Sequence, residues 1–242
     1  MFDTEKDNYL KRSGFSNINL KALLFDMDGV LFDSMPNHAA SWIGAAAAYG
    51  LSMTRGEAYM NEGRTGASTI NEIALRTWGR NATEQEIKQI YSRKTEIFNQ
   101  CPVAQPMPGA LSILNKAKSM GLRIVLATGS GQKTLLDRLN RHFPGIFSAQ
   151  NMVTAYDVKF GKPNPEPYLI ALQKAGVSAN EAIVVENAPL GVRAGVAANV
   201  FTLAVNTGPL ADKILLDEGA DAILPSMNSF DECFYDFVES FR

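Results

Sequence analysis

The sequence predicts an α/β fold, a doubly wound parallel sheet with an all-α segment inserted after the first strand. Short apolar runs that suit buried strands alternate with helical patterns along most of the chain. This alternation is typical of a parallel sheet covered by helices on both faces. It stops between residues 35 and 106, where only helical patterns occur, and prolines at 36, 102, 106 and 108 mark the two ends of that interval.

Six apolar runs are the strand candidates, at residues 22–25, 124–127, 152–154, 183–185, 201–205 and 222–224. The helical patterns of the alternating part lie at 110–120, 133–141, 165–175, 191–198 and 210–218, and those of the insertion at 38–49, 55–62, 69–78 and 84–100. We therefore expect a discontinuous core domain, residues 20–34 and 107–242, and a helical domain at 35–106. Residues 1–19 are polar and mixed in charge, so we expect a surface extension or a short helix there.

Composition excludes several classes of protein. The chain has 242 residues, 46% of them hydrophobic, and a formal net charge of −2, which argues against nucleic acid or a membrane surface as the main partner. Cys101 and Cys233 stand far apart and lack metal-type spacing, so ordinary reduced thiols are expected. Since no apolar run is long enough to span a bilayer, and the N-terminus lacks the apolar segment of a signal peptide, a cytoplasmic location is expected.

Two acids directly follow the first strand candidate. Asp26 and Asp28 are separated by one residue, and Gly29 permits a tight turn after them. Side chains two residues apart in an extended segment point the same way, so the carboxylates are expected to converge where ligands bind in parallel sheets, at the carboxyl end of a strand. The repulsion between the two carboxylates must be compensated by a cation or a shared proton. Such a pair of acids is unfavourable for the stability of the fold but useful for catalysis.

Three further motifs follow strand candidates or lie in the loops after them. They are Thr128-Gly129-Ser130, Lys162 within GKPNPEP (residues 161–167), and Glu186-Asn187. With DMDGVLFDS at residues 26–34, this ordered set resembles the four motifs of the haloacid dehalogenase (HAD) superfamily of phosphotransferases, over residues 20 to about 225. The resemblance implies a Rossmann-like core, and the helical insertion is similar to the cap of the β-phosphoglucomutase-like branch.

The resemblance also implies roles for these residues. Asp26 would be the nucleophile that forms an aspartyl phosphate, and Asp28 the general acid and base. Thr128 would bind the phosphoryl oxygens, with Ser130 beside it at the substrate. Lys162 would place a positive charge on the transferred group and keep Asp26 ionised.

A Mg²⁺ ion is the implied cofactor. Its ligands would come from Asp26, Asp28, Glu186 and Asn187. Members of the family commonly carry acids at both positions of the last pair, whereas this chain has the neutral Asn187. An amide oxygen still suits Mg²⁺, and which of the pair binds the ion directly stays open.

The insertion offers candidate substrate-binding residues. Glu62, Gly63 and Arg64 lie in EGRTG (residues 62–66), where two glycines favour a loop that exposes backbone donors. The resemblance places this loop over the active site, with Arg64 gripping the distal group of the substrate. Glu62 would orient Arg64 or bind a metal or water, and His38, on the first inserted helix, would bond Asp28 or the substrate.

These observations predict Mg²⁺-dependent hydrolysis of a small phosphorylated substrate, either inorganic pyrophosphate or a sugar phosphate. The Glu62–Arg64 loop resembles that of pyrophosphate-cleaving members of the branch. The alternative is a β-phosphoglucomutase, which interconverts β-glucose 1-phosphate and glucose 6-phosphate. Mutases of the branch carry a Lys after the Ser of the second motif, where this chain has Gly131. A non-catalytic binding protein would require a lost nucleophile, and Asp26 is present.

Overall fold

Six parallel strands form the central sheet of the computed structural model, which describes residues 2–130 and 135–242. They are β1 (Ala22–Phe25), β2 (Arg123–Ala127), β3 (Met152–Val153), β4 (Ala182–Glu186), β5 (Phe201–Val205) and β6 (Ala222–Leu224), in the order β3-β2-β1-β4-β5-β6. β1 therefore lies between β2 and β4, inside the sheet. All six strand predictions are confirmed to within one residue at each end.

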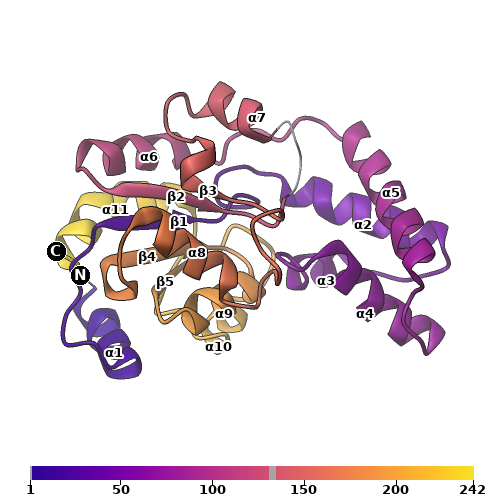
Figure 1. Cartoon of the computed structure of the whole chain (residues 1–242), viewed down its shortest axis with the longest axis horizontal. Coiled ribbons are helices and arrows are strands. Elements are labelled where there is room, and N and C mark those ends of the chain that lie inside the picture. The colour runs from indigo at the N-terminus through magenta and orange to yellow at the C-terminus, as the bar shows by residue number, and fades with distance from the viewer. Residues whose placement is uncertain (1, 131–134) are drawn as a thin grey trace.

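Helices cover both faces of the sheet, as the doubly wound fold requires (Figure 1). Along β1, Leu23 and Phe25 pack into one core and Ala22 and Leu24 into the other, because side chains alternate along a strand. The first core is covered by α6 (Ala110–Ser119), α7 (Leu135–His142) and α11 (Met227–Ser240). The opposite face carries α8 (Glu166–Ala175), α9 (Pro189–Ala197) and α10 (Asp212–Asp217). Two short 3₁₀ helices, Ala149–Asn151 and Ala179–Glu181, precede β3 and β4.

The insertion forms a helical cap beyond the carboxyl ends of the strands (Figure 1). Its helices, α2 (Met35–Ala48), α3 (Arg55–Met60), α4 (Gly66–Trp78) and α5 (Glu84–Gln100), share a hydrophobic core of their own. The exact boundaries at 35 and 106 stay a prediction. In the part of the chain that the structure describes, no helix is both long and apolar enough to cross a membrane.

The two linkers to the cap are hydrogen-bonded to each other. The amide of Asp33 donates to the carbonyl of Gln105 at 2.9 Å, and that of Met107 to Leu31 at 2.8 Å. The sequence places Pro36 in the first linker, but α2 already begins at Met35. Proline fits there because an amide in the first helical turn has no intrahelical acceptor.

The N-terminal segment is an ordered helix, α1 (Asp3–Ser13), whose Lys6 donates a hydrogen bond to the carbonyl of Ser240 on the C-terminal helix at 2.8 Å. The Tyr9 side chain is fully buried, its hydroxyl donates to the carbonyl of Asn199 at 3.1 Å, and its ring meets that of Phe201. Arg12 forms an ion pair with Asp221 at 2.7 Å. Helix α11 has no counterpart in the sequence predictions, although its buried phenylalanines recur at helical spacing.

We expect Tyr9→Ala to destabilise the protein by about 3–5 kcal/mol, since removing a buried aromatic ring leaves a cavity. For a chain of this size, the corresponding fall in melting temperature is roughly 10 °C. Differential scanning calorimetry measures it. Tyr235→Ala is the control, because Tyr235 is half exposed on α11. If the two variants have the same melting temperature, the burial of Tyr9 on α1 does not stabilise the fold.

Candidate active site

The acid pair lies in a tight turn at the end of β1. The amide of Asp26 still donates to the carbonyl of Val185 on β4 at 3.0 Å, which continues the sheet by one residue. Gly29 adopts a φ of +87°, and a Cβ placed there would lie 2.0 Å from the side-chain nitrogen of Asn187. Only glycine therefore allows the turn to approach Asn187 this closely.

Lys162 reaches Asp26 from the loop that follows β3. Its Nζ lies 2.5 Å from Asp26 Oδ1, 2.6 Å from Glu186 Oε1 and 3.1 Å from the carbonyl of Ala127. Burial would lower the pKa of this ammonium, but the two carboxylates raise it well above its usual range. Lys162 therefore stays charged beside Asp26.

Glu186 holds Lys162 in place. Oε1 accepts hydrogen bonds from Lys162 and from the hydroxyl of Tyr168 (2.6 Å), while Oε2 accepts from the amides of Asn187 (3.0 Å) and Ala188 (3.3 Å). Gly191 gives the carboxylate its space, since a Cβ there would lie 1.9 Å from Oε1. Because both oxygens are engaged, these contacts favour an orienting role for Glu186 and leave Asn187 as the better candidate metal ligand of the pair.

Glu62 of the cap meets Asn187 of the core. The amide nitrogen of Asn187 donates to Glu62 Oε2 at 3.3 Å. The other oxygen of each side chain, Asn187 Oδ1 and Glu62 Oε1, is buried without a hydrogen-bond partner among the described residues. Burial and the charges of Asp26, Glu186 and Asp28 raise the pKa of Glu62 well above its usual range.

These oxygens fit a hard cation. Buried oxygens without a donor are unfavourable, and a cation would compensate for both them and the clustered carboxylates. Burial, Glu186 and Asp28 also raise the pKa of Asp26 to about 8, against the lowering effect of Lys162. No three His, Cys, Asp or Glu side chains within residues 2–130 and 135–242 form a ready metal cluster, so the amide oxygen of Asn187 would have to take part.

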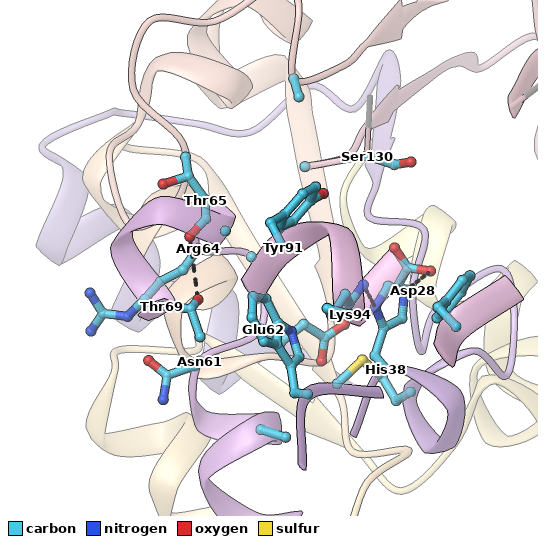
Figure 2. A pocket seen from close by; sticks show the side chains of 18 of the residues that line it. Asp28, His38, Asn61, Glu62, Arg64, Thr65, Thr69, Tyr91, Lys94 and Ser130 are labelled. Carbon is cyan, nitrogen blue, oxygen red and sulfur yellow. Dashed lines mark hydrogen bonds and ion pairs between the residues drawn. The ribbon is translucent and has the colours of Figure 1, made fainter. Parts of the chain in front are cut away.

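A chain of contacts links Asp28 to the cap (Figure 2). Asp28 Oδ1 accepts a hydrogen bond from Ser34 Oγ at 2.5 Å and lies 3.3 Å from His38 Nε2, while His38 Nδ1 lies 3.1 Å from Lys94 Nζ. Burial would raise the pKa of Asp28, but His38, Ser34 and Arg138 bring it below its usual range. If Lys94 donates to Nδ1, then Nε2 carries the proton that His38 donates to Asp28.

The second motif forms the wall beside the acids. Thr128 is buried at the end of β2, where its amide donates to Val153 and its hydroxyl accepts from the amide of Ser130 at 3.1 Å. Ser130 lines the same pocket as Asp26 and Asp28. Gly63 of the cap packs on the stem of Lys162, since a Cβ there would lie 3.1 Å from Cδ. The structure thus brings Ser130 and Gly63 to the pocket of the acid pair, with Thr128 buried behind Ser130.

Arg64 is not brought to the acids. Figure 2 shows its side chain extending away from Asp28 and His38. The guanidinium pairs with Glu72 on α4 at 2.9 Å and approaches Ser68 at 3.4 Å. This arrangement corrects the expectation that Glu62 orients Arg64, because Glu62 instead faces Asn187.

A pocket of about 500 Å³ lies between cap and core. Asp26, Asp28 and Ser130 line its core side. On the cap side, Lys94 is buried, with its Nζ 4.7 Å from the ring centre of Phe98 and 5.5 Å from that of Trp42. Burial lowers the pKa of Lys94 to about 8, although Asp28 and Cys101 raise it.

Sequence reasoning missed several of these residues. Tyr168 bonds Glu186 but lies just outside the third motif, and Ser34, the last residue of the first motif, bonds Asp28 although the sequence assigns it no role. Lys94 looks like any other lysine of a charged helix. No local pattern could identify its surroundings, because His38 and Trp42 reach it from another helix, α2.

Comparisons of the sequence with known proteins point to one family. Residues 20–199 match the family described as "Hydrolase: haloacid dehalogenase-like hydrolase". Hexitol phosphatase A of Escherichia coli is 31% identical over 208 residues, which cover 86% of this chain and 91% of that protein. The phosphorylated carbohydrates phosphatase of Thermotoga maritima is 31% identical over 210 residues, covering 85% and 94%.

Solved structures of related proteins also resemble this chain over most of its length. A Bacteroides vulgatus protein described as "Putative beta-phosphoglucomutase" is 59% identical, with a TM-score of 0.96, and the match covers 100% of this chain and 98% of that one. A β-phosphoglucomutase of Clostridium difficile is 23% identical, with a TM-score of 0.74 over 91% of this chain and 96% of that one. At that identity the second match concerns the fold alone.

Proposed function

Since the chain belongs to the haloacid dehalogenase-like hydrolase family, we propose that it hydrolyses a small phosphorylated substrate through an aspartyl phosphate on Asp26. The observation that carries the proposal is Lys162, whose ammonium lies between Asp26 and Glu186 at 2.5 and 2.6 Å. This pairing favours the ionised form of the nucleophile, against the burial that raises its pKa, and leaves positive charge where the phosphoryl group would bind.

The proposed reaction has two steps. A carboxylate oxygen of Asp26 attacks phosphorus and the bond to the leaving oxygen breaks. Water then attacks the same phosphorus, releases phosphate and restores Asp26. Asp28, held by Ser34 and His38, would relay a proton from His38 to the leaving oxygen and take one from the water.

Mg²⁺ is the cofactor that we propose. Asp26, Asp28, Asn187 and Glu62 would hold it, and it would neutralise charge on the phosphoryl oxygens. The unpartnered oxygens of Asn187 and Glu62 support this choice. Glu186 is the least suited of the four residues suggested by the sequence, because both of its oxygens already accept hydrogen bonds. We also propose a cytoplasmic location, where the free thiols of Cys101 and Cys233 would stay reduced.

Inorganic pyrophosphate is the substrate that we favour. Glu62 adds a fourth carboxylate whose charge acts on those of Asp26, Asp28 and Glu186, which suits a highly charged substrate that binds together with a cation. Lys94, a buried cation on the far side of the pocket, is available to a departing phosphate.

A phosphorylated sugar or sugar alcohol is the second candidate. The relatives named above as phosphatases of hexitols and carbohydrates support it, and the aromatic rings of Trp42, Tyr91 and Phe98 in the pocket suit a sugar. A β-phosphoglucomutase is the less favoured alternative. It must hold a distal phosphate in two orientations, and Gly131, outside the described residues, offers no side chain for that.

A single screen separates these functions. Phosphate release is measured with pyrophosphate, hexitol phosphates and hexose phosphates, with and without Mg²⁺. Beside it, a coupled assay follows glucose 6-phosphate formation from β-glucose 1-phosphate with a bisphosphate activator. We expect pyrophosphate to give the highest kcat/KM. A mutase rate far above every hydrolytic rate would overturn the proposal of hydrolysis, whereas a higher rate on hexitol phosphates would overturn only the choice of substrate.

We expect Glu62→Gln to lower kcat/KM for pyrophosphate by roughly 10- to 100-fold, the loss of one charge-assisted contact. The amide keeps the size of the side chain but removes the charge that would face the cation. Steady-state kinetics with Glu96→Gln as control measures this, because Glu96 is an exposed residue of α5 paired with Arg93. Equal kinetics for both variants would remove Glu62 from the substrate-bound site.

The pKa of Lys94 predicts a pH dependence. Because burial lowers it to about 8, the ammonium loses its charge as pH rises through that value, and kcat/KM for pyrophosphate should fall. Lys94→Arg should move the fall to higher pH, and Lys94→Met should remove it while lowering kcat/KM at pH 7. Comparing the three profiles cancels the ionisation of pyrophosphate itself. Three superimposable profiles would contradict the role of Lys94.

A further inference from the structure

The loop after β5, residues 206–210, contacts both the cap and the turn that follows Asp28. We infer that this loop is the docking platform of the cap and that Thr207 is a positioning residue, which ties cap docking to the geometry of Gly29 and Asn187. The kinetic part of the inference rests on the function proposed above.

The platform is rigid because Asn206, its first residue, is hydrogen-bonded to Leu210, its last residue, and to the neighbouring strand. The backbone amide of Asn206 donates to the carbonyl of Leu224 on β6 at 2.8 Å. Its side-chain amide donates to the carbonyl of Leu210 at 2.8 Å and to Asp212 at 2.5 Å. The loop is therefore closed on itself at the edge of the sheet.

The cap rests on this loop. Tyr59 of α3 is buried, and a Cβ placed on Gly208 would lie 2.9 and 3.0 Å from two atoms of its ring. Leu210 packs against the hydrophobic core of the cap. Gly208 thus provides a flat surface on which the Tyr59 ring lies, and a larger residue would push the ring away.

The same loop reaches the catalytic turn. Thr207 Oγ1 donates to the carbonyl of Gly29 at 2.6 Å. Gly29 packs directly on the side-chain amide of Asn187, which contacts Glu62. The amide of Glu62 in turn donates to the carbonyl of Tyr59 at 3.3 Å.

These contacts close a ring, Tyr59–Gly208–Thr207–Gly29–Asn187–Glu62. Four of its six members, Tyr59, Glu62, Thr207 and Gly208, belong to the cap or its platform, and the other two, Gly29 and Asn187, to the proposed metal-binding side of the core. Undocking Tyr59 would move the turn that presents Glu62, and losing the Thr207 bond would free the turn that supports Asn187. Cap closure and the assembly of the site are thereby coupled through packed, hydrogen-bonded residues.

The test combines hydrogen–deuterium exchange with kinetics on pyrophosphate. Thr207→Val removes the hydroxyl at nearly constant volume and should lower kcat by about 3- to 10-fold, the loss of one hydrogen bond. It should also increase amide exchange in residues 29–32 and 59–64. Thr207→Ser keeps the hydroxyl and should restore most of both properties. If Thr207→Val and Thr207→Ser have the same kcat and the same amide exchange, Thr207 has no positioning role.

A double-mutant cycle tests the docking contact. Gly208→Ala should increase exchange in residues 59–64 and lower kcat, and this cost should largely disappear in a Tyr59→Leu background, where the ring is gone. Gly56→Ala on the same cap helix is the matched control, since its Cβ would meet nothing within 4 Å. Gly208→Ala and Gly56→Ala with equal effects would overturn the platform. The exchange data decide this inference even if the wild type hydrolyses no phosphorylated substrate, a result that would refute the proposed function alone.

Discussion

Asp26→Asn is expected to lower turnover by roughly 10⁴-fold or more, because an amide cannot form the covalent bond to phosphorus on which the proposed reaction depends. The substitution preserves volume, and the amide can still accept a hydrogen bond from Lys162. Circular dichroism and the melting temperature should therefore show a folded protein. Phosphate release under saturating substrate and Mg²⁺ measures the effect.

Asp33→Asn is the matched control for this variant. Asp33 is exposed and lies seven residues further along the same segment, so its loss should change turnover little. A folded Asp26→Asn protein that releases phosphate at close to the wild-type rate would remove Asp26 from the chemistry and, with it, the proposed reaction.

Removing divalent cations should abolish activity almost as completely. Chelation by EDTA would leave the carboxylates of Asp26, Asp28 and Glu62 with Lys162 as the main compensating charge, and substrate anions would be repelled. Activity should return when Mg²⁺ is added in excess. Titration calorimetry of Mg²⁺ binding gives a second readout that does not depend on turnover.

Variants of Asn187 separate a binding role from a structural one. Asn187→Asp keeps an oxygen ligand and should retain Mg²⁺ binding, whereas Asn187→Ala loses the ligand and should weaken binding by at least tenfold. Full activity in thoroughly chelated protein, or equal Mg²⁺ affinity in both variants, would rule out the site as described.

The motifs could be predicted from sequence because each is local. A strand and the turn after it are encoded by neighbouring residues, so Asp26, Thr128 and Glu186 were placed at strand ends correctly. The parallel sheet then brings those ends together. Lys162 is likewise local to its GKPNPEP motif, in the loop of residues 154–165 between β3 and α8.

The remaining contacts depend on how distant elements pack. Glu62 reaches Asn187 only because the cap docks on the core, and the ion pair of Arg64 with Glu72 of α4 forms within the cap. The sequence leaves residues 1–19 as either a surface extension or a short helix, because the segment is polar and mixed in charge, and the structure has the helix α1 there. Its burial of Tyr9 depends on Phe201 and Asn199, residues that no local pattern connects with it.

The covalent intermediate on Asp26 is the central claim, and trapping it is the most direct test. Enzyme in excess over pyrophosphate labelled with ³²P is mixed with Mg²⁺, quenched in acid within milliseconds, and digested for peptide mass spectrometry. We predict that the label and the mass of one phosphoryl group appear on the peptide containing Asp26, and that both are lost in Asp26→Asn. If phosphate is released in the first turnover with no label on the protein at any time point, or if the label resides on another residue, Asp26 is not the nucleophile.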